Sequence, residues 1–433
     1  MNTLGRCLMP LAVAVTAVVG WPAVPYGQGQ PGAATAFLGA RIIDGTGAPA
    51  IEGGTVVVRD GRIAAVGPAA TVQVPAGATR IDAAGMTIVP GLVNAHGHVQ
   101  ALSGGAVRDE LIGRLRTYAS YGVTTVVSLG QNAETAEVVR LRDEQVQGPL
   151  NRARVYTSGP SQRGLATPAA ARAAVETLAA QRVDRIKFHM AEGPGAMSPE
   201  VYGALIEAAH ARKLKAAAHI FTLDEAKGVL GRGIDIVAHS VRDRDADAAF
   251  IAGMKKRNIV YIPTLTRELS VFVYESTPAF FTDPFFLRGR RLYQADVDSL
   301  SEPARQARVR GDTSAQAIKA ALTQASRNLK LLSDAGVPIA LGTDSGAAAG
   351  RFQGYFEHLE REMMVEAGMT PAQVLVAATS AAARASGLDD VGILAPGKAA
   401  DLLVLRADPR QDIRNTRQIH SVWIAGRQME IEK

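Results

Sequence analysis

The sequence almost lacks cysteine: Cys7 is the only one among 433 residues. It lies just before an apolar run from Leu8 to Gly20, and Arg6 is the only charged residue among the first 30. This order predicts a secretory signal peptide over residues 1–30, with an uncleaved N-terminal anchor as the alternative. We therefore expect a periplasmic or secreted protein. After processing it would hold no thiol, which excludes disulfides, cysteine nucleophiles and thiolate metal ligands.

Long apolar runs and concentrated charge are missing too. After residue 30 no stretch approaches the ~20 apolar residues of a membrane-spanning helix. A protein with several membrane spans is excluded, and no stable membrane insertion is expected after signal cleavage. The net charge is +6 and the isoelectric point is about 9.4, but no run of five basic residues occurs. This favours a basic, solvated surface, and no nucleic-acid partner is expected.

A β-rich pattern is present at both ends of the chain. Before residue 90 stand AFLGARIIDGTG, GTVVVRDGRIAAVG and ATRIDAAGMTIVPG, and near the C-terminus stand KAADLLVLRADP and HSVWIAGRQMEI. Apolar fragments separated by glycine turns are typical of short antiparallel strands. We predict that residues 34–90 and 391–433 form one small β-sandwich domain built from both termini.

The middle of the chain, residues 91–390, alternates apolar runs of strand length with helix-like segments. The runs are TIVPGLVNAH, TTVVSLG, ARVYTSG, DRIKFH, LKAAAHI, DIVAHS, IVYIPTL and VPIALGTD. Apolar strands joined by helical crossovers imply a parallel sheet in an α/β protein. Eight repeats favour a (β/α)8 TIM barrel over an open doubly wound sheet. Neither a G-x-G-x-x-G after the first strand nor a P-loop is present.

One aromatic insertion interrupts this alternation. The segment VFVYESTPAFFTDPFFLRGRRLY follows IVYIPTL and carries seven of the 22 aromatic residues. Loops at the C-terminal mouth of a barrel form the substrate pocket. The insertion is therefore either a lid or pocket wall, or a loop packed on neighbouring helices. Its Arg288, Arg290 and Arg291, together with Arg267, would either neutralise a substrate carboxylate or lie on a solvated surface.

Six side chains suited to metal chemistry lie in or at the ends of the predicted strands, where barrel enzymes place catalytic groups. They are, in chain order, His96, His98, Lys187, His219, His239 and Asp344. Taken singly, each histidine could bond a backbone carbonyl, and the aspartate could cap a turn. A lysine buried in IKF without a partner would cost several kcal/mol. Together, four imidazoles and a carboxylate at one mouth predict a divalent metal site, with zinc as the leading candidate.

The whole pattern resembles the amidohydrolase superfamily over nearly all of the chain after residue 30. The opening signature reads MTIVPGLVNAHGH, preceded by DGTG and VVVRDGRIAAVG, and the closing signature reads GILAPGKAADLLVL. The resemblance points to the branch of imidazolonepropionase-related enzymes and secreted Xaa-Pro or aminoacyl dipeptidases. One-metal imidazolonepropionases lack a lysine in the fourth strand, so Lys187 indicates the two-metal dipeptidase side.

The resemblance implies a centre of two divalent ions. His96, His98 and Asp344 would hold the buried ion, His219 and His239 would hold the more exposed one, and Lys187 would bridge them after carboxylation by carbon dioxide. Asp344 would act as the catalytic general base and acid, taking a proton from the nucleophilic water and giving it to the leaving amine.

Three further residues are candidates for substrate contacts: Phe221, His189 and Tyr261. Phe221 stands where dipeptidase relatives often have a tyrosine that touches the substrate carboxylate. His189 shares a strand face with Lys187, and it either reaches the pocket or packs behind it. Deaminase relatives use a glutamate shortly after the fifth-strand histidine, but Glu225 lies six residues on, at a helix start, which fits that role poorly.

The sequence thus predicts an exported metal-dependent hydrolase of carbon–nitrogen bonds. Its substrate would be a small molecule, a peptide or an N-acyl amino-acid amide. The alternatives on the same centre are a cyclic-amide hydrolase, a lactonase or a phosphotriesterase-like enzyme, because fold and metal centre do not determine the substrate. A barrel that binds without chemistry is a third hypothesis. The resemblance also makes a homo-oligomer possible.

Overall fold

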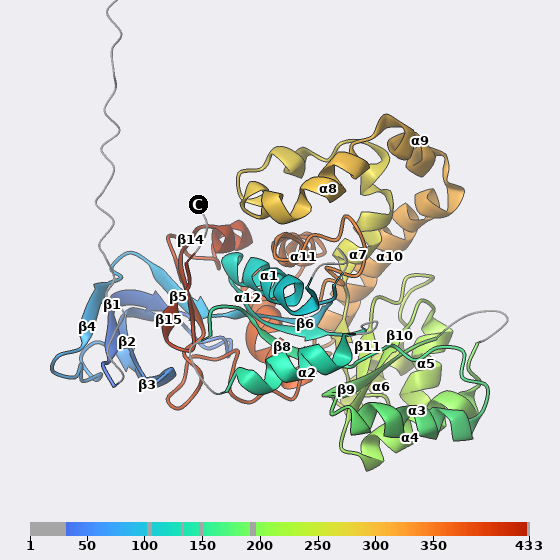
Figure 1. Cartoon of the computed structure of the whole chain (residues 1–433), viewed down its shortest axis with the longest axis horizontal. Helices are drawn as coiled ribbons and strands as arrows, with labels where there is room; N and C mark the ends of the chain where they lie inside the picture. The colour runs from blue at the N-terminus through green and yellow to red at the C-terminus, as the bar shows by residue number, and fades with distance from the viewer. Residues whose placement is uncertain (1–31, 102–105, 131–133, 147–149, 191–195, 431–433) are drawn as a thin grey trace, which may run out of the picture.

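The computed structural model describes residues 32–101, 106–130, 134–146, 150–190 and 196–430. The predicted signal peptide, residues 1–30, lies outside the described residues. The fold is mixed α/β, with one sheet at one end of the molecule and two parallel sheets surrounded by helices toward the other (Figure 1). Within the described ranges, no helix has both the length and the apolar character that crossing a membrane requires.

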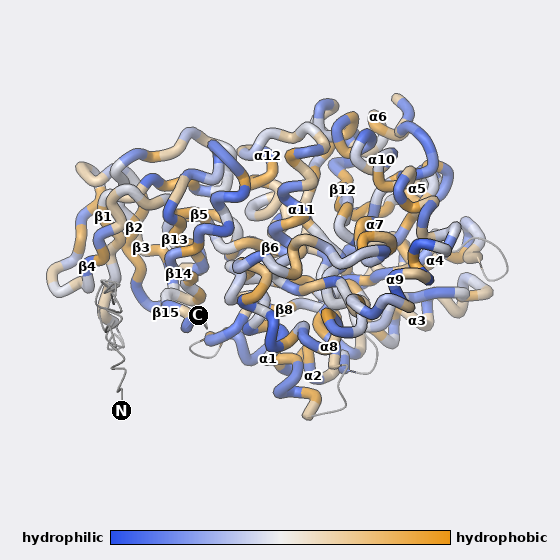
Figure 2. The backbone as a smooth tube through the Cα atoms, turned by 90° about the horizontal axis from the view of Figure 1, so that it is seen from above, coloured by the Kyte–Doolittle hydropathy of each residue, from blue (hydrophilic) through white to orange (hydrophobic). Residues whose placement is uncertain are grey.

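The first sheet combines strands from both ends of the chain. Its eight strands are β1 (Thr35–Ile42), β2 (Ile51–Arg59), β3 (Arg62–Pro68), β4 (Thr79–Asp82), β5 (Thr87–Pro90), β13 (Leu402–Leu405), β14 (Ile419–Ile424) and β15 (Arg427–Gln428). The order is β15-β14-β13-β5-β1-β2-β3, and β4 pairs with β1. The Phe37 and Trp423 rings meet edge to face, with centroids 5.0 Å apart. An apolar cluster therefore holds the N-terminal and C-terminal segments together (Figure 2). The predicted domain boundaries stay a prediction.

Seven strands form two parallel sheets. One contains β6 (Leu92–Gly97), β7 (Val123–Ser128) and β8 (Arg154–Thr157), and the other contains β9 (Arg185–His189), β10 (Lys215–His219), β11 (Ile236–Ala238) and β12 (Val260–Ile262). Nearly all of their residues are buried, as the apolar runs predict. The α/β class is confirmed, and the strand pairing assigns these seven strands to two parallel sheets without by itself closing a barrel.

The first predicted strand is divided in two. TIVPGLVNAH contains β5, which pairs with β1 and β13, and β6, which pairs with β7. The break falls at Gly91, where an added Cβ would lie 2.1 Å from Oγ1 of Thr124. Because only glycine fits so close to the neighbouring strand, the chain can pass here from one sheet to the other.

The eighth predicted strand is a segment around residues 337–344 that forms an isolated bridge between Ile339 and Tyr261. The amide of Ala340 donates to the carbonyl of Tyr261 at 3.0 Å, and the amide of Ala95 on β6 donates to the carbonyl of Leu341 at 2.9 Å. At the opposite edges, the amide of His189 on β9 donates to the carbonyl of Gln162, just after β8, at 3.0 Å. Backbone hydrogen bonds thus connect the two parallel sheets on both sides.

Helices follow most of the parallel strands. They are α1 (Val107–Ser120), α2 (Thr135–Glu144), α3 (Pro168–Ala180), α4 (Pro199–Ala211), α5 (Leu223–Gly231) and α6 (Ala248–Lys256). The helix-like run from Pro371 to Arg384 contains α12 (Pro371–Val376), the π-helical turn η4 (Ala377–Ala381) and α13 (Ala382–Ala385). A last 3-10 turn, η5 (Ile413–Arg417), precedes β14.

The aromatic insertion forms a helical layer above α7 and α11 (Figure 1). Its elements and the helices beside it are α7 (Leu265–Phe272), η1 (Val273–Glu275), η2 (Ala279–Thr282), η3 (Phe286–Gly289), α8 (Arg290–Leu300), α9 (Pro303–Gly311), α10 (Thr313–Asp334) and α11 (Tyr355–Glu366). Its aromatic rings pack on one another and on the start of α11 and the residues just before it: the Phe286 ring lies 4.9 Å from that of Phe352 and 5.1 Å from that of Tyr355 between centroids. Of the two interpretations of this segment, the structure favours packing on neighbouring helices.

Candidate metal centre

His98 and Asp344 form the best-defined part of the site. His98 follows β6, and its Nδ1 lies 2.8 Å from the carbonyl oxygen of Gly130. A carbonyl only accepts, so Nδ1 carries the hydrogen and Nε2 is the nitrogen presented to the site. Nε2 lies 2.8 Å from Oδ1 of Asp344, and Nε2 of His96 lies 3.3 Å from the same oxygen. The ligand atoms of these three residues all lie within 4.8 Å of one another.

Asp344 is held as a carboxylate. Burial raises its pKa, but the charge of Arg351 and the close contacts with His96 and His98 outweigh this and hold the pKa well below its ordinary value. Arg351 pairs with the other carboxylate oxygen, and its Nε donates to Oγ of Ser270 at 3.1 Å. The backbone of Asp344 has a φ of +58°, which a residue with a side chain adopts only at a cost of about 1–2 kcal/mol.

His219 and His239 continue the site on β10 and directly after β11. The His239 ring centroid lies 4.0 Å from that of His219 and 4.6 Å from that of His96. Nδ1 of His239 lies 2.7 Å from Oγ1 of Thr264, which leaves Nε2 for the site. Burial lowers the pKa of His96 to about 3 and lowers those of His219 and His239 well below the ordinary value. All three imidazoles are therefore neutral at pH 7, as metal ligands must be.

Lys187 lies in the middle of β9 and is buried, with 1% of its surface exposed. Among the described residues, Nζ of Lys187 and Nδ1 of His96 have no hydrogen-bond partner. Burial lowers the pKa of Lys187 to about 7. The positive charge of Lys187 also lowers the pKa values of His96, His219 and His239. Lys187 therefore lies close enough to interact electrostatically with all three histidines.

These residues fit a divalent cation. Two imidazoles and a carboxylate point at one region, and nitrogen and carboxylate oxygen are donors that suit zinc. Nε2 of His98 and Oδ1 of Asp344 face each other at 2.8 Å, and a cation bound by both atoms would stabilise this arrangement. The structure thus brings together the histidines and aspartate that the sequence predicts, and His96, His98 and Asp344 form the candidate metal-binding group.

The three predicted substrate contacts lie in different surroundings. The His189 ring stacks on His219 with centroids 4.3 Å apart. Phe221 is exposed, and the guanidinium of Arg242 lies 4.2 Å from its ring centroid. Tyr261 is fully buried, and its hydroxyl accepts a hydrogen bond from the amide of Val241 at 2.9 Å. Its ring thus has no exposed surface, whereas His189 lies next to His219 and Phe221 lies beside Arg242. All three roles stay predictions.

Glu225 caps a helix, as its position in the sequence suggests. Its carboxylate accepts the amides of Phe221 and Thr222 at 2.6 and 2.9 Å, while Oγ1 of Thr222 accepts the amide of Glu225 at 3.1 Å. This reciprocal pair is the capping box of α5. The carboxylate is occupied at the helix start, which agrees with its poor fit to a deaminase.

Several residues that contact the candidate ligands or their neighbours were not predicted from the sequence. They are Arg351, which pairs with Asp344; Thr264, which bonds His239; and Asn94, Glu357 and Glu360, which bond the backbone and side chains next to the ligands. Glu357 and Glu360 lie three residues apart on α11 and are both fully buried. Their spacing puts them on one helix face, but nothing in the local sequence marks that face as buried.

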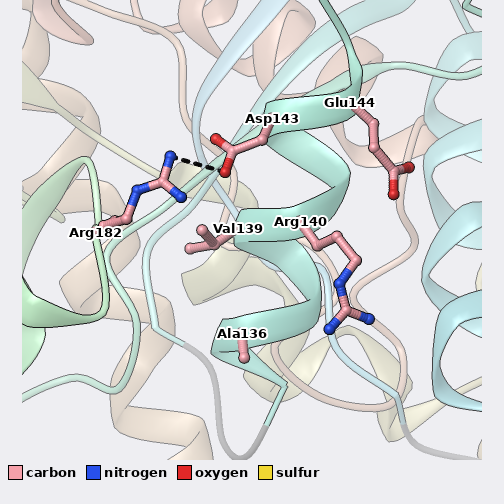
Figure 3. A pocket seen from close by; sticks show the side chains of 6 residues that line it. All are labelled: Ala136, Val139, Arg140, Asp143, Glu144 and Arg182. Carbon is pink, nitrogen blue, oxygen red and sulfur yellow. Dashed lines mark ion pairs between the residues drawn. The ribbon is translucent and has the colours of Figure 1, made fainter. Parts of the chain in front are cut away.

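A separate hollow of about 360 Å³ lies over α2 (Figure 3). It is lined by Ala136, Val139, Arg140, Asp143, Glu144 and Arg182. Asp143 and Arg182 form an ion pair at 2.8 Å across it. None of the predicted site residues lines this hollow, and its other two charged residues, Arg140 and Glu144, pair with Glu137 and Arg108 outside the lining.

Comparison with known proteins defines the class. The model of the amidohydrolase family matches residues 87–429, so this chain belongs to the amidohydrolase family. The prediction of an enzyme, a hydrolase acting on carbon–nitrogen bonds, is thereby confirmed at the level of the family.

Individual relatives agree with the predicted branch. The chain is 26% identical to the imidazolonepropionase of Streptomyces avermitilis over 399 residues, which cover 88% of this chain and 87% of that protein. A putative prolidase from Bifidobacterium longum superposes with a TM-score of 0.74 at 27% identity, covering 92% and 95% of the two chains. A Xaa-Pro dipeptidase with bound methionine gives a TM-score of 0.71 at 20% identity, covering 92% and 100%. The last similarity shows a shared fold.

Proposed function

We propose that this protein is an exported, binuclear metal-dependent amidohydrolase that cleaves the amide bond of a dipeptide or an N-acyl amino acid. The observation that carries the proposal is the convergence of Nε2 of His98 and Nε2 of His96 on Oδ1 of Asp344, at 2.8 and 3.3 Å, in a region that also contains the buried Lys187. Similarity to a prolidase at 27% identity supports the substrate class.

His96, His98 and Asp344 would hold one divalent ion, His219 and His239 the other, and zinc suits this donor set. Bound there, divalent ions would lower the pKa of water and polarise the scissile carbonyl. Lys187 would bridge the two sites after its neutral amine has attacked carbon dioxide, formed an N–C bond and lost a proton. This change turns a buried, unpartnered base into an anionic ligand, which removes the cost of burying an ammonium group.

Asp344 would serve as the proton carrier of the reaction. Its Oδ1 faces the two histidines, so it is placed to accept a proton from the attacking water and to deliver it to the leaving amine. Arg351 contacts the other carboxylate oxygen and fixes the orientation of the group. His189 and Phe221, beside His219 and Arg242, would contact the substrate.

The fold we propose for the catalytic part is a closed (β/α)8 barrel. The seven parallel strands supply all but one of its members, and the segment at residues 337–344 supplies the eighth. The backbone hydrogen bonds at both edges of the two sheets support closure. A barrel would bring the strand ends with all six ligands to one mouth.

Metal content per chain is the decisive test. Wild type and Lys187→Ala are prepared with bicarbonate, and zinc, manganese, cobalt and iron are quantified. We expect two divalent ions per chain in the wild type and one or none in the variant. One ion in both proteins would refute the bridging role of Lys187, and a metal-free wild type after zinc loading would refute the metal centre.

A cyclic-amide hydrolase is the second candidate, because the imidazolonepropionase similarity extends over 88% of the chain. A panel of dipeptides, N-acyl amino acids, imidazolones, lactones and aryl phosphotriesters separates the two functions. Turnover of dipeptides or N-acyl amino acids at least ten-fold above all other classes is expected. Preferential turnover of the imidazolone would establish the second candidate instead.

Export rests on the N-terminal sequence alone, the apolar run from Leu8 to Gly20 after Arg6. Expression of the full chain with an intact N-terminus should yield a shortened protein in the periplasm or the medium. N-terminal sequencing locates the cleavage point. A full-length product retained in the cytoplasm would refute export.

A further inference from the structure

We propose that two buried glutamates of α11, Glu357 and Glu360, are positioning residues for the two halves of the metal centre: Glu357 for the group of His96, His98 and Asp344, and Glu360 for His239. This inference rests on the proposed function, because it concerns the ligands of that centre. Both carboxylates are 0% exposed, and they lie three residues apart, on one face of the helix. Glu357 accepts hydrogen bonds from the two segments that carry His96 and Asp344, whereas Glu360 accepts them from the start of α7, directly after the threonine that contacts His239.

Glu357 holds the first half through a single oxygen. Its Oε1 accepts Oγ of Ser345 at 2.6 Å, Oγ1 of Thr343 at 2.8 Å, and Nδ2 of Asn94. Thr343 and Ser345 flank Asp344 in the chain. Asn94 lies two residues before His96, and its Oδ1 accepts the amide of His96 at 2.9 Å. One carboxylate oxygen therefore ties together the two segments that carry His96 and Asp344.

Glu360 holds the second half through both oxygens. Oε1 accepts the amide of Leu265 at 2.7 Å, while Oε2 accepts the amide of Thr266 at 2.7 Å and its hydroxyl at 2.6 Å. These are the first residues of α7, where amides lack partners within the helix. The residue before them, Thr264, bonds Nδ1 of His239 at 2.7 Å and has a φ of +50°. Glu360 thus fixes the turn that orients the His239 ring.

Substitution by glutamine should affect the two glutamates differently, because their carboxylate oxygens have different hydrogen-bond partners. Oε2 of Glu357 has no hydrogen-bond partner among the described residues, so Glu357→Gln can place its NH2 group there and keep the accepting oxygen. Glu360→Gln has no such position. Whichever oxygen becomes NH2, it faces a backbone N–H, of Leu265 or Thr266. Two donors that face each other in a buried site leave both unsatisfied.

The experiment measures zinc binding rather than activity. Metal-free wild type, Glu357→Ala, Glu357→Gln, Glu360→Ala and Glu360→Gln are titrated with Zn²⁺ against a chromophoric chelator in bicarbonate. His98→Ala and His239→Ala assign the two dissociation constants to the two halves. Glu366→Ala and Glu366→Gln are matched controls, because Glu366 lies at the exposed end of the same helix.

Loss of a residue that orients a metal ligand typically weakens binding by ~10–100-fold. We expect that loss for the first ion in Glu357→Ala and for the second ion in both Glu360 variants. Glu357→Gln should stay within about three-fold of wild type, as should the Glu366 controls.

If Glu357→Ala and Glu360→Ala both bind zinc with wild-type affinity, the inference is overturned. It is also overturned if Glu357→Gln loses as much zinc affinity as Glu357→Ala. If the alanine variants do not fold, the two glutamine variants decide: equal affinities in them overturn the inference. If wild type binds no zinc, the proposed function itself fails. If only the inference fails, wild type still binds two ions.

Discussion

The ion pair between Arg154 and Asp401 connects the parallel strands to the terminal sheet. Arg154 on β8 donates from Nε to Oδ2 of Asp401 at 2.6 Å and from Nη2 to Oδ1 at 3.1 Å. Oδ1 also accepts the amide of Ala425, between β14 and β15, at 2.7 Å. Both charged residues are buried, with 9% and 3% exposed. Asp401→Ala would remove three hydrogen bonds and leave a guanidinium buried without its anion.

Breaking a buried pair from one side costs about 3–5 kcal/mol, mostly because the remaining charge loses its compensation. With an unfolding entropy of about 2.1 cal/mol/K per residue, a chain of this size should lose roughly 3–6 °C in Tm. Calorimetry and urea unfolding would measure both quantities. The matched control is Asp390→Ala: its pair with Arg62 at 3.3 Å is exposed on both sides, and such pairs contribute about 0–1 kcal/mol.

A double variant tests the cause of the loss. If the unpaired guanidinium is responsible, Arg154→Met combined with Asp401→Ala should be more stable than Asp401→Ala alone. A loss below about 1 kcal/mol in Asp401→Ala, equal to that of Asp390→Ala, would show that the pair is no more important than a surface pair. A double variant less stable than Asp401→Ala would refute the proposed cause.

Three further substitutions have defined outcomes. Thr222→Ala removes the side-chain acceptor of the α5 capping box and should cost about 1 kcal/mol in urea unfolding; no loss would show that the cap is replaced by water. Tyr121→Phe breaks two 2.8 Å hydrogen bonds, to the carbonyl of Phe286 and from the amide of Gly289, and should cost about 1–3 kcal/mol and loosen the aromatic insertion, measured by amide exchange there. Gly354→Ala puts a Cβ 2.3 Å from Cδ2 of Tyr121 at a φ of +83°, so soluble yield and Tm should both drop sharply, and a wild-type Tm would contradict the close packing.

The strands and the ligand positions were the predictable part. Apolar runs of strand length report burial on both faces, and the six chemical residues stand at fixed places in or after those runs, so their convergence follows from a parallel arrangement. The division of the first run at Gly91 was not predicted, because Pro-Gly within an apolar run fits a turn and a strand end equally well. The deciding factor is the closeness of the next strand, since a Cβ added at Gly91 would lie 2.1 Å from Oγ1 of Thr124, and no local pattern contains this contact.

The buried glutamates that support the ligands could not be predicted from the local sequence either, because their partners lie far away in the chain. In the α11 sequence YFEHLEREMMVE, charged residues look like a solvated face. Instead Glu357 bonds Asn94, which lies 263 residues away in the chain, and Glu360 bonds the start of α7, about 95 residues away. The aromatic insertion was open to two interpretations, because aromatic residues suit both a pocket wall and a packed layer. Its contacts with Phe352 and Tyr355 decided for packing.

Several unfavourable features of the fold lie at the candidate centre. Lys187 is buried without a hydrogen-bond partner among the described residues, and His239, Thr264 and Asp344 adopt positive φ. Such features persist only where the surroundings determine them strongly, and they concentrate at functional sites. Here the surroundings include the buried carboxylates of α11, whose hydrogen bonds reach residues next to Asp344 and His239. The rigid part of the site is thus built to hold ligand atoms in place before any cation arrives. In the function proposed above, carboxylation of Lys187 would offset the cost that packing leaves there.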